Sequence, residues 1–326
     1  HGNPPVRLLL PAARIADPRP MGESGRHVRC TVEAGGVRAR AVAFGCDGRL
    51  PVATGEPADL VVGLELDRWQ GTVEPRLLLR HAQPCAPAPI EVVGEPEDYL
   101  RAALAELDAP LEPPAPAPVR SAPADRRDRG IAGTLAALVA SGEPVLAVCA
   151  HVPARLRALR GRLGGFALCS WTALERDPAL AAPYAHVVAI DPPSRRAAVA
   201  QVTVMAWGTP ELHFARQIHE REHRLREPLV ALYRALRDAG GARGDRLVAL
   251  LRGDDPTRPA PVAGRLLRVL AELDLVRVDP AAGAVDVPPA QRTELERSPT
   301  YRAAQQRLEE GLAWLSTPPT PARRAA

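Results

Sequence analysis

The stretch RHVRCTVEAGGVRARAVAFG, residues 26–45, decides how the first part of this chain is interpreted. Apolar Val28, Cys30 and Val32 alternate with polar side chains, which is the pattern of a strand with one buried face and one solvated face. Two glycines then interrupt the chain before a second β-like run, 37–44, begins. The stretch therefore predicts two consecutive strands with a turn between them.

Similar β-like runs lie on both sides of this stretch, at 6–15, 59–66 and 74–81, and turn-forming segments separate them. Five short strands in this length suit a small closed barrel such as an OB-fold. We therefore expect an OB-like β-barrel over residues 1–85.

The composition changes in the next segment, 86–128. A short helix is expected at 95–108, and the proline-rich stretch 109–127 follows it. Proline at this density gives a stiff, extended spacer. We therefore expect a linker and a domain boundary here.

Residues 129–217 alternate between helical segments and short apolar runs, which predicts a small, degenerate α/β lobe with a parallel sheet. We also expect 202–208 and 211–217 to extend that sheet. The runs that predict its buried strands are 144–150, 166–170 and 186–191.

The last part, 218–326, is mostly helical. Three helices followed by a two-stranded hairpin have the order of a winged-helix module, and a final helix is expected at 294–315. The predicted fold class is thus multidomain with mixed α and β structure. The segments of the winged-helix module are 227–241, 245–253, 260–274, 275–279 and 283–287.

The composition is that of a globular chain, with 46% hydrophobic and 25% charged residues. The chain contains no lysine, so all 42 basic residues are arginines. A P-loop needs a lysine on the phosphates, and Schiff-base catalysis needs a lysine amine, so neither chemistry is expected. A formal charge of +4 permits a polyanionic partner.

The five cysteines are scattered and form no C-x-x-C pair, so a zinc ribbon is not indicated. We expect a reducing, cytoplasmic location, and no signal peptide or membrane-length apolar run is present. The chain begins at His1 without a methionine, and we expect it to be part of a longer protein.

The pentapeptide HEREH, residues 219–223, fits the zinc-protease pattern H-E-x-x-H, in which two histidines on one helix face bind zinc. Its variable positions are the charged Arg221 and Glu222, and RLREP follows. We therefore interpret the segment as a solvated junction, and we keep a zinc hydrolase only as a remote alternative.

The solvent face of the predicted barrel carries arginines at alternating positions, and Trp69 lies at a strand end. A positive groove combined with a stacking ring is typical of proteins that bind single-stranded nucleic acid. The alternative interpretation is a solvated outer face with a packed tryptophan. The arginines concerned are Arg29, Arg38, Arg40, Arg76 and Arg80.

Several motifs in this region resemble the OB region of bacterial RecJ, the single-stranded-DNA-specific exonuclease. In that family a G-N-P-x-P-like turn leads into a barrel with a K/H-L-x-hydrophobic strand, an A-I-A-F strand and an N-x-W-x-G turn. The matching residues here are Gly2, Asn3 and Pro4 in the first turn, His27 and Val28, Ala43 and Phe44, and Trp69 and Gly71, with Asp67 in place of the usual asparagine.

The closing segment also resembles the end of longer RecJ chains, where an L-x-x-S-x-x-Y motif precedes the last helix, and Leu295, Ser298 and Tyr301 match it. The resemblance implies a protein that serves a 5′→3′ exonuclease of single-stranded DNA in repair and recombination. The nucleic-acid-binding residues that we predict are Asn3 and His27 together with Arg29, Arg38, Arg40, Trp69, Arg76 and Arg80.

One departure from the family concerns its catalytic centre, a D-H-H-containing cluster that holds two divalent metals, and a G-G-H motif that helps to bind the substrate. This chain contains neither triplet, and no Asp/His cluster offers the carboxylates that two-metal hydrolysis needs. We therefore predict the C-terminal portion of a RecJ-like nuclease without a catalytic centre or cofactor of its own. Mn or Mg is expected in the missing catalytic half.

Three further features are candidates for binding. Asp191 ends an apolar strand, where ligand sites of α/β folds are found. Arg265 and Arg268 lie on the predicted recognition helix of the winged-helix module. A cluster of arginines on one helix could also meet DNA, and its members are Arg155, Arg157, Arg160 and Arg162.

The alternative to DNA binding is a protein-interaction platform. In it the α/β lobe and the winged helix would dock a single-stranded-DNA-binding protein or a helicase, while the barrel packs against the missing nuclease core. Oligonucleotide affinity distinguishes the two hypotheses, because only the first requires it.

Overall fold

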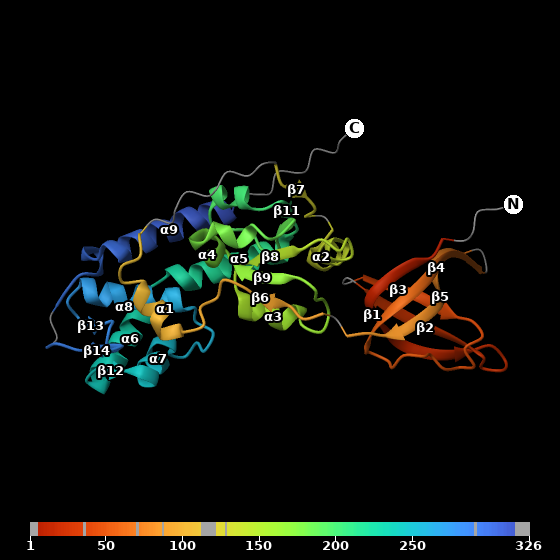
Figure 1. Ribbon diagram of the computed structural model, residues 1–326, viewed down its shortest axis with the longest axis horizontal. Coiled ribbons are helices and arrows are strands. Elements are labelled where there is room, and N and C mark those ends of the chain that lie inside the picture. The colour runs from red at the N-terminus through yellow and green to blue at the C-terminus, as the bar shows by residue number, and fades with distance from the viewer. Residues whose placement is uncertain are drawn as a thin grey trace.

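Three parts follow one another along the chain: a β-barrel, a lobe built on a parallel sheet, and a helical module (Figure 1). This arrangement confirms the predicted fold class. The computed structural model describes residues 6–34, 37–69, 72–86, 88–111, 122–127, 129–289 and 292–316.

Five strands form the closed barrel, in the order β1-β2-β3-β5-β4. β1 pairs with β2 on one side and with β4 on the other, and the parallel strands β3 and β5 close the barrel, where Ala41 lies opposite Leu77. A five-stranded barrel of this kind is an OB-fold. The strands are β1 (Leu8–Met21), β2 (His27–Ala34), β3 (Val37–Ala43), β4 (Pro57–Trp69) and β5 (Thr72–Pro84).

β1 can pair with both β2 and β4 because it bends twice. Its register shifts once against β4 and once against β2, and Ala12 (φ 49°) and Asp17 (φ 50°) lie in the left-handed region within these shifts. An extra residue in one strand of a pair bends that strand and increases its twist. β1 therefore curves from one half of the barrel to the other.

The alternation in β2 is confirmed. Val28, Cys30 and Val32 are buried and pack with Leu60 in the barrel core, whereas Arg29 is exposed. Because successive side chains of a strand point to opposite faces, this pattern fixes the register of β2.

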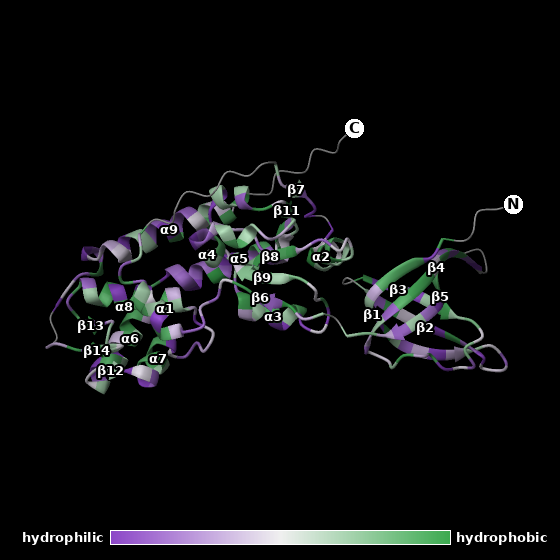
Figure 2. Cartoon of the chain, viewed as in Figure 1, coloured by the Kyte–Doolittle hydropathy of each residue, from purple (hydrophilic) through white to green (hydrophobic). Residues whose placement is uncertain are grey.

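The second part is a lobe with a six-stranded sheet in the order β6-β9-β8-β10-β11-β7, and every pair in it is parallel. Its strand β8 is buried throughout, because its side chains contribute alternately to a cluster on each face. Strands buried on both faces are continuously apolar, and Figure 2 shows this for β8 and β9. The strands are β6 (Glu91–Val92), β7 (Ala124–Asp125), β8 (Val145–Cys149), β9 (Ala167–Ser170), β10 (His186–Ala189) and β11 (Val204–Met205).

Helices of this lobe connect the strands and cover the sheet. The α-helices are α2 (Ile131–Val139), α3 (Val152–Leu159) and α4 (Trp171–Arg176), and the 3-10 helices are η1 (Pro178–Ala181) and η2 (Arg196–Gln201).

Helix α5 (Thr209–His223) stands where a strand was expected at 211–217. Pro210 lies in its first turn, and the Glu211 carboxylate accepts a hydrogen bond of 2.7 Å from the backbone N–H of Gly208. Both features start a helix. The prediction for 211–217 is therefore wrong, whereas 202–208 does extend the sheet through β11.

The described residues of the segment 86–128 belong partly to the sheet of the lobe and partly to the helical module. β6 pairs with β9, and β7 pairs with β11. Helix α1 (Tyr99–Ala105) begins at the N-cap Asp98, whose carboxylate accepts from the backbone N–H of Arg101 at 2.9 Å, and it packs against α8. These pieces are thus integral to the sheet and to the helical module.

The third part has the winged-helix arrangement, with a three-stranded sheet in the order β12-β14-β13 beside three helices. Leucines from all three helices form its core, Leu229 and Leu236 among them. The elements are α6 (Arg226–Ala239), β12 (Ala242–Arg243), α7 (Gly244–Arg252), α8 (Ala260–Glu272), β13 (Arg277–Asp279) and β14 (Ala284–Asp286), followed by the 3-10 helix η3 (Leu295–Arg297) and by α9 (Pro299–Leu315).

Contacts between the parts are unequal. The Arg14 side chain on β1 donates to the backbone carbonyls of Gly55 and of Gly161, and Gly161 belongs to the lobe. The lobe and the helical module share far more, because α5 packs along α9 (Figure 1). Among the helices that the structure describes, none combines the length and hydropathy needed to span a bilayer.

Candidate functional site

The outer face of β2 and β3 carries three of the predicted DNA-contacting arginines, and none of the three is buried. Two of them are held by carboxylates. Arg38 lies 3.0 Å from Glu33, and Arg40 lies 2.6 Å from Glu74. Arg29 forms no ion pair with any residue that the structure describes.

Arg76 on β5 is the most constrained arginine of this face. Its Nη1 lies 2.9 Å from Asp67 and its Nη2 lies 3.3 Å from Glu65, and its side chain is only 21% exposed. Arg80 is exposed near the register shift between β4 and β5, and it too has no ion pair within the described ranges.

The ion pairs reduce the positive charge that the sequence predicted for this face of the barrel. Of the five predicted arginines, Arg38, Arg40 and Arg76 already have carboxylate partners. Arg29 and Arg80 are therefore left as the arginines of this face whose charge no neighbouring carboxylate offsets within the described chain.

An aromatic pair lies at the end of the same face. Phe44 follows β3 and is 50% exposed, and the His27 ring meets it edge-on with 5.2 Å between the centroids. The backbone N–H of Gly45 donates to Nδ1 of His27 at 2.9 Å, which orients the imidazole. The Arg76 guanidinium lies 6.0 Å from the Phe44 ring centre. The barrel thus presents a partly exposed, positioned ring.

Phe44 was matched to a family motif but was not predicted as a binding residue. The alternation of β3 could have identified it, because Ala41 and Ala43 point inward and the next position must point outward. Asn3 lies outside the described residues. Trp69 is the last residue of β4, and its side chain is likewise outside what the structure describes.

The lobe offers no open nucleotide site at Asp191. This carboxylate is fully buried, accepts from the backbone N–H of Ala150 at 3.0 Å, and pairs with Arg155. Burial raises the pKa of Asp191, and the Arg155 guanidinium opposes that rise. Arg155 also stacks on Phe214 at 4.5 Å. The pair therefore fills the space around Asp191, so this carboxylate is not open to a ligand.

This inward position removes Arg155 from the arginine cluster that was expected to meet DNA. The other three members, Arg157, Arg160 and Arg162, are not buried.

The predicted recognition helix α8 is covered by α1 and cannot enter a DNA groove. A Cβ at Gly264 would lie 2.2 Å from the carbonyl oxygen of Ala103, so α1 approaches α8 at backbone distance. Arg268 donates to the Glu106 carbonyl at 3.0 Å and pairs with Glu272. The expectation of DNA contacts by Arg265 and Arg268 is therefore wrong in this arrangement.

The two histidines of HEREH are buried, which corrects the interpretation of the segment as a solvated junction, although Arg221 is exposed. His219 is 3% exposed and His223 is 6% exposed, because α9 packs over this part of α5. Nε2 of His219 donates to the Arg307 carbonyl at 3.0 Å, and Nδ1 of His223 donates to the His219 carbonyl at 3.1 Å. A Cβ at Gly311 would lie 2.1 Å from the His219 ring, so only glycine allows this approach.

Burial lowers the pKa of both histidines, so both are neutral at pH 7. Within the described ranges no group of three or more His, Cys, Asp and Glu side chains is placed to hold a metal ion. These residues therefore do not fit a zinc site or a two-metal nuclease centre.

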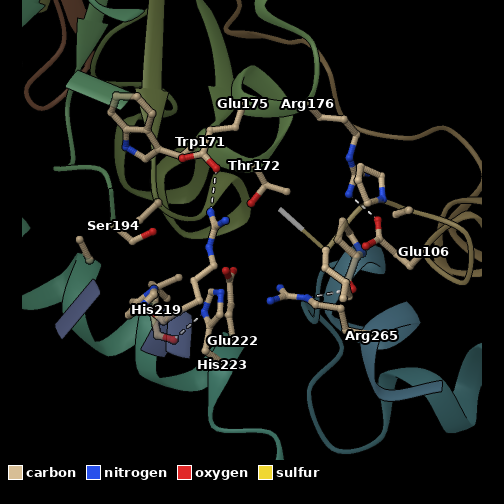
Figure 3. A pocket seen from close by; sticks show the side chains of 18 of the residues that line it. Glu106, Trp171, Thr172, Glu175, Arg176, Ser194, His219, Glu222, His223 and Arg265 are labelled. Atoms are coloured by element: carbon tan, nitrogen blue, oxygen red, sulfur yellow. Dashed lines mark hydrogen bonds and ion pairs between the residues drawn. The ribbon is translucent and has the colours of Figure 1, made fainter. Parts of the chain in front are cut away.

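The buried end of α5 lines a pocket between the lobe and the helical module (Figure 3). The pocket has a volume of about 320 Å³ and adjoins a second hollow of about 200 Å³. Both open at the carboxyl edge of the parallel sheet, where Ala150 follows β8 and Thr172 follows β9. Ligands of open α/β sheets bind at this edge.

Comparison with known proteins bears on the barrel. Residues 1–81 match the family model described as "RecJ OB domain". The N-terminal barrel is therefore a RecJ-type OB domain, as its motifs predicted. A search of curated proteins found no match.

Two solved structures of RecJ from Thermus thermophilus, one in complex with Mg2+ and one with Mn2+, resemble the chain. They are 16% and 15% identical to it, with TM-scores of 0.22 and 0.21. The alignments cover 82% and 81% of this chain, but only 32% and 30% of those proteins. The chain thus spans about a third of the length of the RecJ structures that it matches.

Proposed function

We propose that the barrel binds single-stranded nucleic acid, and single-stranded DNA in particular. The observation that carries this proposal is a closed OB barrel that matches the RecJ OB domain and presents the Phe44 ring, buttressed by His27, at one end of its β2–β3 face. OB-folds use this face and the flanking loops to bind oligonucleotides.

Phe44 supplies the stacking surface in this proposal, because every base has a π-face that a half-exposed ring can meet. Arg29 lies on the same face and has no carboxylate partner among the described residues, so its guanidinium is available for a phosphate. Arg38 and Arg40 are 62% and 80% exposed and can exchange a carboxylate for a phosphate at little cost.

Arg76 has a different role in the proposal. Its two carboxylate partners and its position 6.0 Å from the Phe44 ring suit a residue that holds the ring in place. Asn3, Trp69 and Arg80 stay predicted contacts.

The wider role follows from the same match. The chain would serve a RecJ-like 5′→3′ exonuclease of single-stranded DNA in the cytoplasm, in repair and recombination, with the metal-dependent chemistry and its Mn or Mg in another part of that protein. The described residues of this chain would bind and guide the strand.

A second candidate function applies to the helical module. α8 is covered by α1, so this winged helix does not offer its recognition helix to DNA. Docking of a protein, such as a single-stranded-DNA-binding protein or a helicase, is the function that this burial favours for the module.

The test is fluorescence anisotropy of a labelled single-stranded oligonucleotide with the whole chain, at two salt concentrations and with duplex as competitor. We expect saturable binding that prefers the single strand and that falls in the Phe44→Ala, Arg29→Gln double variant. Val37→Ala is a suitable control, because Val37 is also exposed on β3 but belongs to the other face of the strand. Absence of binding at low salt would refute the proposal.

A further inference from the structure

The pocket between the lobe and the helical module contains an unusual set of charges. Two of its carboxylates are offset by arginines: Glu106 pairs with Arg176, and Glu175 lies 2.7 Å from Arg307 and 3.7 Å from Arg195. Glu106 and Glu175 are each 7% exposed, so both carboxylates lie in the interior, whereas the Arg176 side chain is 52% exposed.

Arg265 and Glu222 remain without such partners. Nε of Arg265 donates only to Pro261, at 3.4 Å in its own helix, and its two terminal nitrogens have no partner among the described residues. The Glu222 carboxylate has neither a hydrogen bond nor an ion pair with any residue described. In Figure 3 the two side chains extend from α8 and α5 toward one another across the hollow.

His223 adds an acceptor beside them. Its Nδ1 hydrogen is used by the His219 carbonyl, so in the neutral ring Nε2 carries a lone pair. Only 6% of the residue is exposed, and Nε2 has no partner in the described chain. The hollow thus offers one guanidinium fork and two acceptors.

This combination selects among anions. A guanidinium fork binds the oxygens of a carboxylate, a sulfate or a phosphate equally well in geometry. Above pH 7, where Glu222 is mostly ionised, a carboxylate or a sulfate has no hydrogen to donate and meets Glu222 as a like charge. Inorganic phosphate keeps one proton at and above neutral pH, and a phosphate monoester, whose second pKa is about 6, can take one up on binding. A phosphate group can therefore accept from Arg265 and donate to Glu222 or His223 at the same time.

We propose that this pocket is a phosphate-binding site, in which Arg265 donates to the phosphate oxygens and Glu222 accepts from, or shares, the remaining proton. The site is independent of the barrel and of its proposed binding of DNA. The phosphate can be free or can be the group of a small phosphate monoester. The pocket volume of about 320 Å³ and its apolar walls, which include Trp171, Ile218 and Pro192, leave room for an organic body.

The proton gives the site a pH dependence. Burial raises the pKa of Glu222 to about 7, against the opposing effect of nearby arginines. A phosphate monoester is mostly unprotonated above pH 7, so its complex must take up a proton there and its affinity falls about tenfold per pH unit. The groups that face Glu222 are Arg221 and His223 on its own helix, Arg265 on α8, Arg307 on α9 and Glu95 after β6.

The experiment is isothermal titration calorimetry of the whole chain at pH 8 with sodium phosphate and with sodium sulfate. Inorganic phosphate still carries a proton at pH 8 and sulfate carries none, so we expect phosphate to bind at least about tenfold more tightly. In Glu222→Gln the negative charge is gone, and sulfate should then bind as well as phosphate. Equal affinity for the two anions in the parent chain would overturn the proposal.

Arg265→Gln should weaken phosphate binding roughly tenfold or more, because a charge-assisted pair of hydrogen bonds is lost. Arg216→Gln removes the same charge from an exposed position of α5 and should leave the affinity unchanged. If Arg265→Gln does not fold by circular dichroism, Arg265→Lys keeps the charge without the fork and should also lose affinity. Unchanged affinity in either Arg265 variant contradicts the assignment.

A third titration, with a nucleoside 5′-monophosphate at pH 6.5, identifies the source of the phosphate. Tighter binding than that of inorganic phosphate at the same pH indicates an organic phosphate, and equal binding indicates the free anion. No heat from phosphate or from the monophosphate at millimolar concentration, at either pH, would refute the site.

Discussion

The barrel face and the buried pocket are built from the same kind of pair, an arginine against a carboxylate, but in opposite surroundings. On the barrel, Arg40 is 80% exposed and Glu74 is 49% exposed. In the pocket, the side chain of Glu175 is 8% exposed and that of its partner Arg307 is 26% exposed. Water screens the first pair, and the protein interior surrounds the second.

The difference decides what each region can do. An exposed pair contributes little to stability and can open to accept a phosphate. A buried carboxylate cannot lose its partner without leaving an unpaired charge in the interior. The barrel face is therefore suited to a long polyanion whose phosphates replace the carboxylates. The pocket is suited to one small ligand that binds the unpaired Arg265.

The largest effect is expected when a buried pair is broken. Glu175→Gln leaves Arg307 and Arg195 without their carboxylate and should lower the free energy of unfolding by about 3 kcal/mol. Trp171 and Trp314 lie in this region and report on its unfolding in urea. The matched change on the barrel, Glu74→Gln, should cost less than about 1 kcal/mol. Equal losses would show that the two environments do not differ as the burial indicates.

The next largest effect is the pH dependence that Glu222 gives to stability. Its pKa is raised from 4.5 to about 7 in the folded chain, chiefly by burial, so the folded state binds more protons than the unfolded state between these values. The free energy of unfolding should therefore fall as the pH rises from 4.5 to 7, by at most about 3 kcal/mol from this group.

Glu222→Gln isolates that contribution, because the stability of the variant relative to the parent should rise over this range and level off above pH 7. His219 and His223 act in the opposite direction. Their lowered pKa values cost stability as the pH falls below their ordinary value of 6.5. A constant difference between variant and parent from pH 5 to 8 would show that Glu222 is ionised throughout.

A smaller effect is expected on the barrel, where a single ring is removed. Phe44→Ala should weaken binding of a single-stranded oligonucleotide by about 1–3 kcal/mol, because stacking on one base is lost. Val37→Ala, which truncates an exposed side chain on the other face of β3, should leave the affinity unchanged. Anisotropy titrations at one salt concentration measure both, and equal losses would indicate a general effect on the barrel.

The smallest effect is expected in the salt dependence of oligonucleotide binding, and it distinguishes arginines with a carboxylate partner from arginines without one. Each phosphate contact contributes about −0.7 to the slope of log affinity against log salt for a single strand. Arg29→Gln should reduce the magnitude of that slope by about 0.7. Arg40→Gln should change it less, because Arg40 must first release Glu74. A larger change for Arg40 than for Arg29 would reverse this order.

Helices and strands were predicted well where neighbouring residues alone determine them. The alternation in β2 placed Val28, Cys30 and Val32 in the core. The continuous apolar runs of β8 and β10 predicted strands that are buried on both faces. At 211–217 we expected a strand that would extend the sheet, but the local signals of Pro210 and Glu211 start a helix.

The sequence by itself determined the barrel, the parallel sheet and the order of the winged helix, because periodicity, turn residues and family motifs are carried by neighbouring positions. It did not determine which charges are free. Glu175 and Arg307 are 132 positions apart, and Arg268 on α8 bonds to Ala109, beyond the end of α1, across 159 positions. Only tertiary packing brings such groups together, so the burial of His219 and His223, the covering of α8 and the unpaired Arg265 were decided by the folded structure.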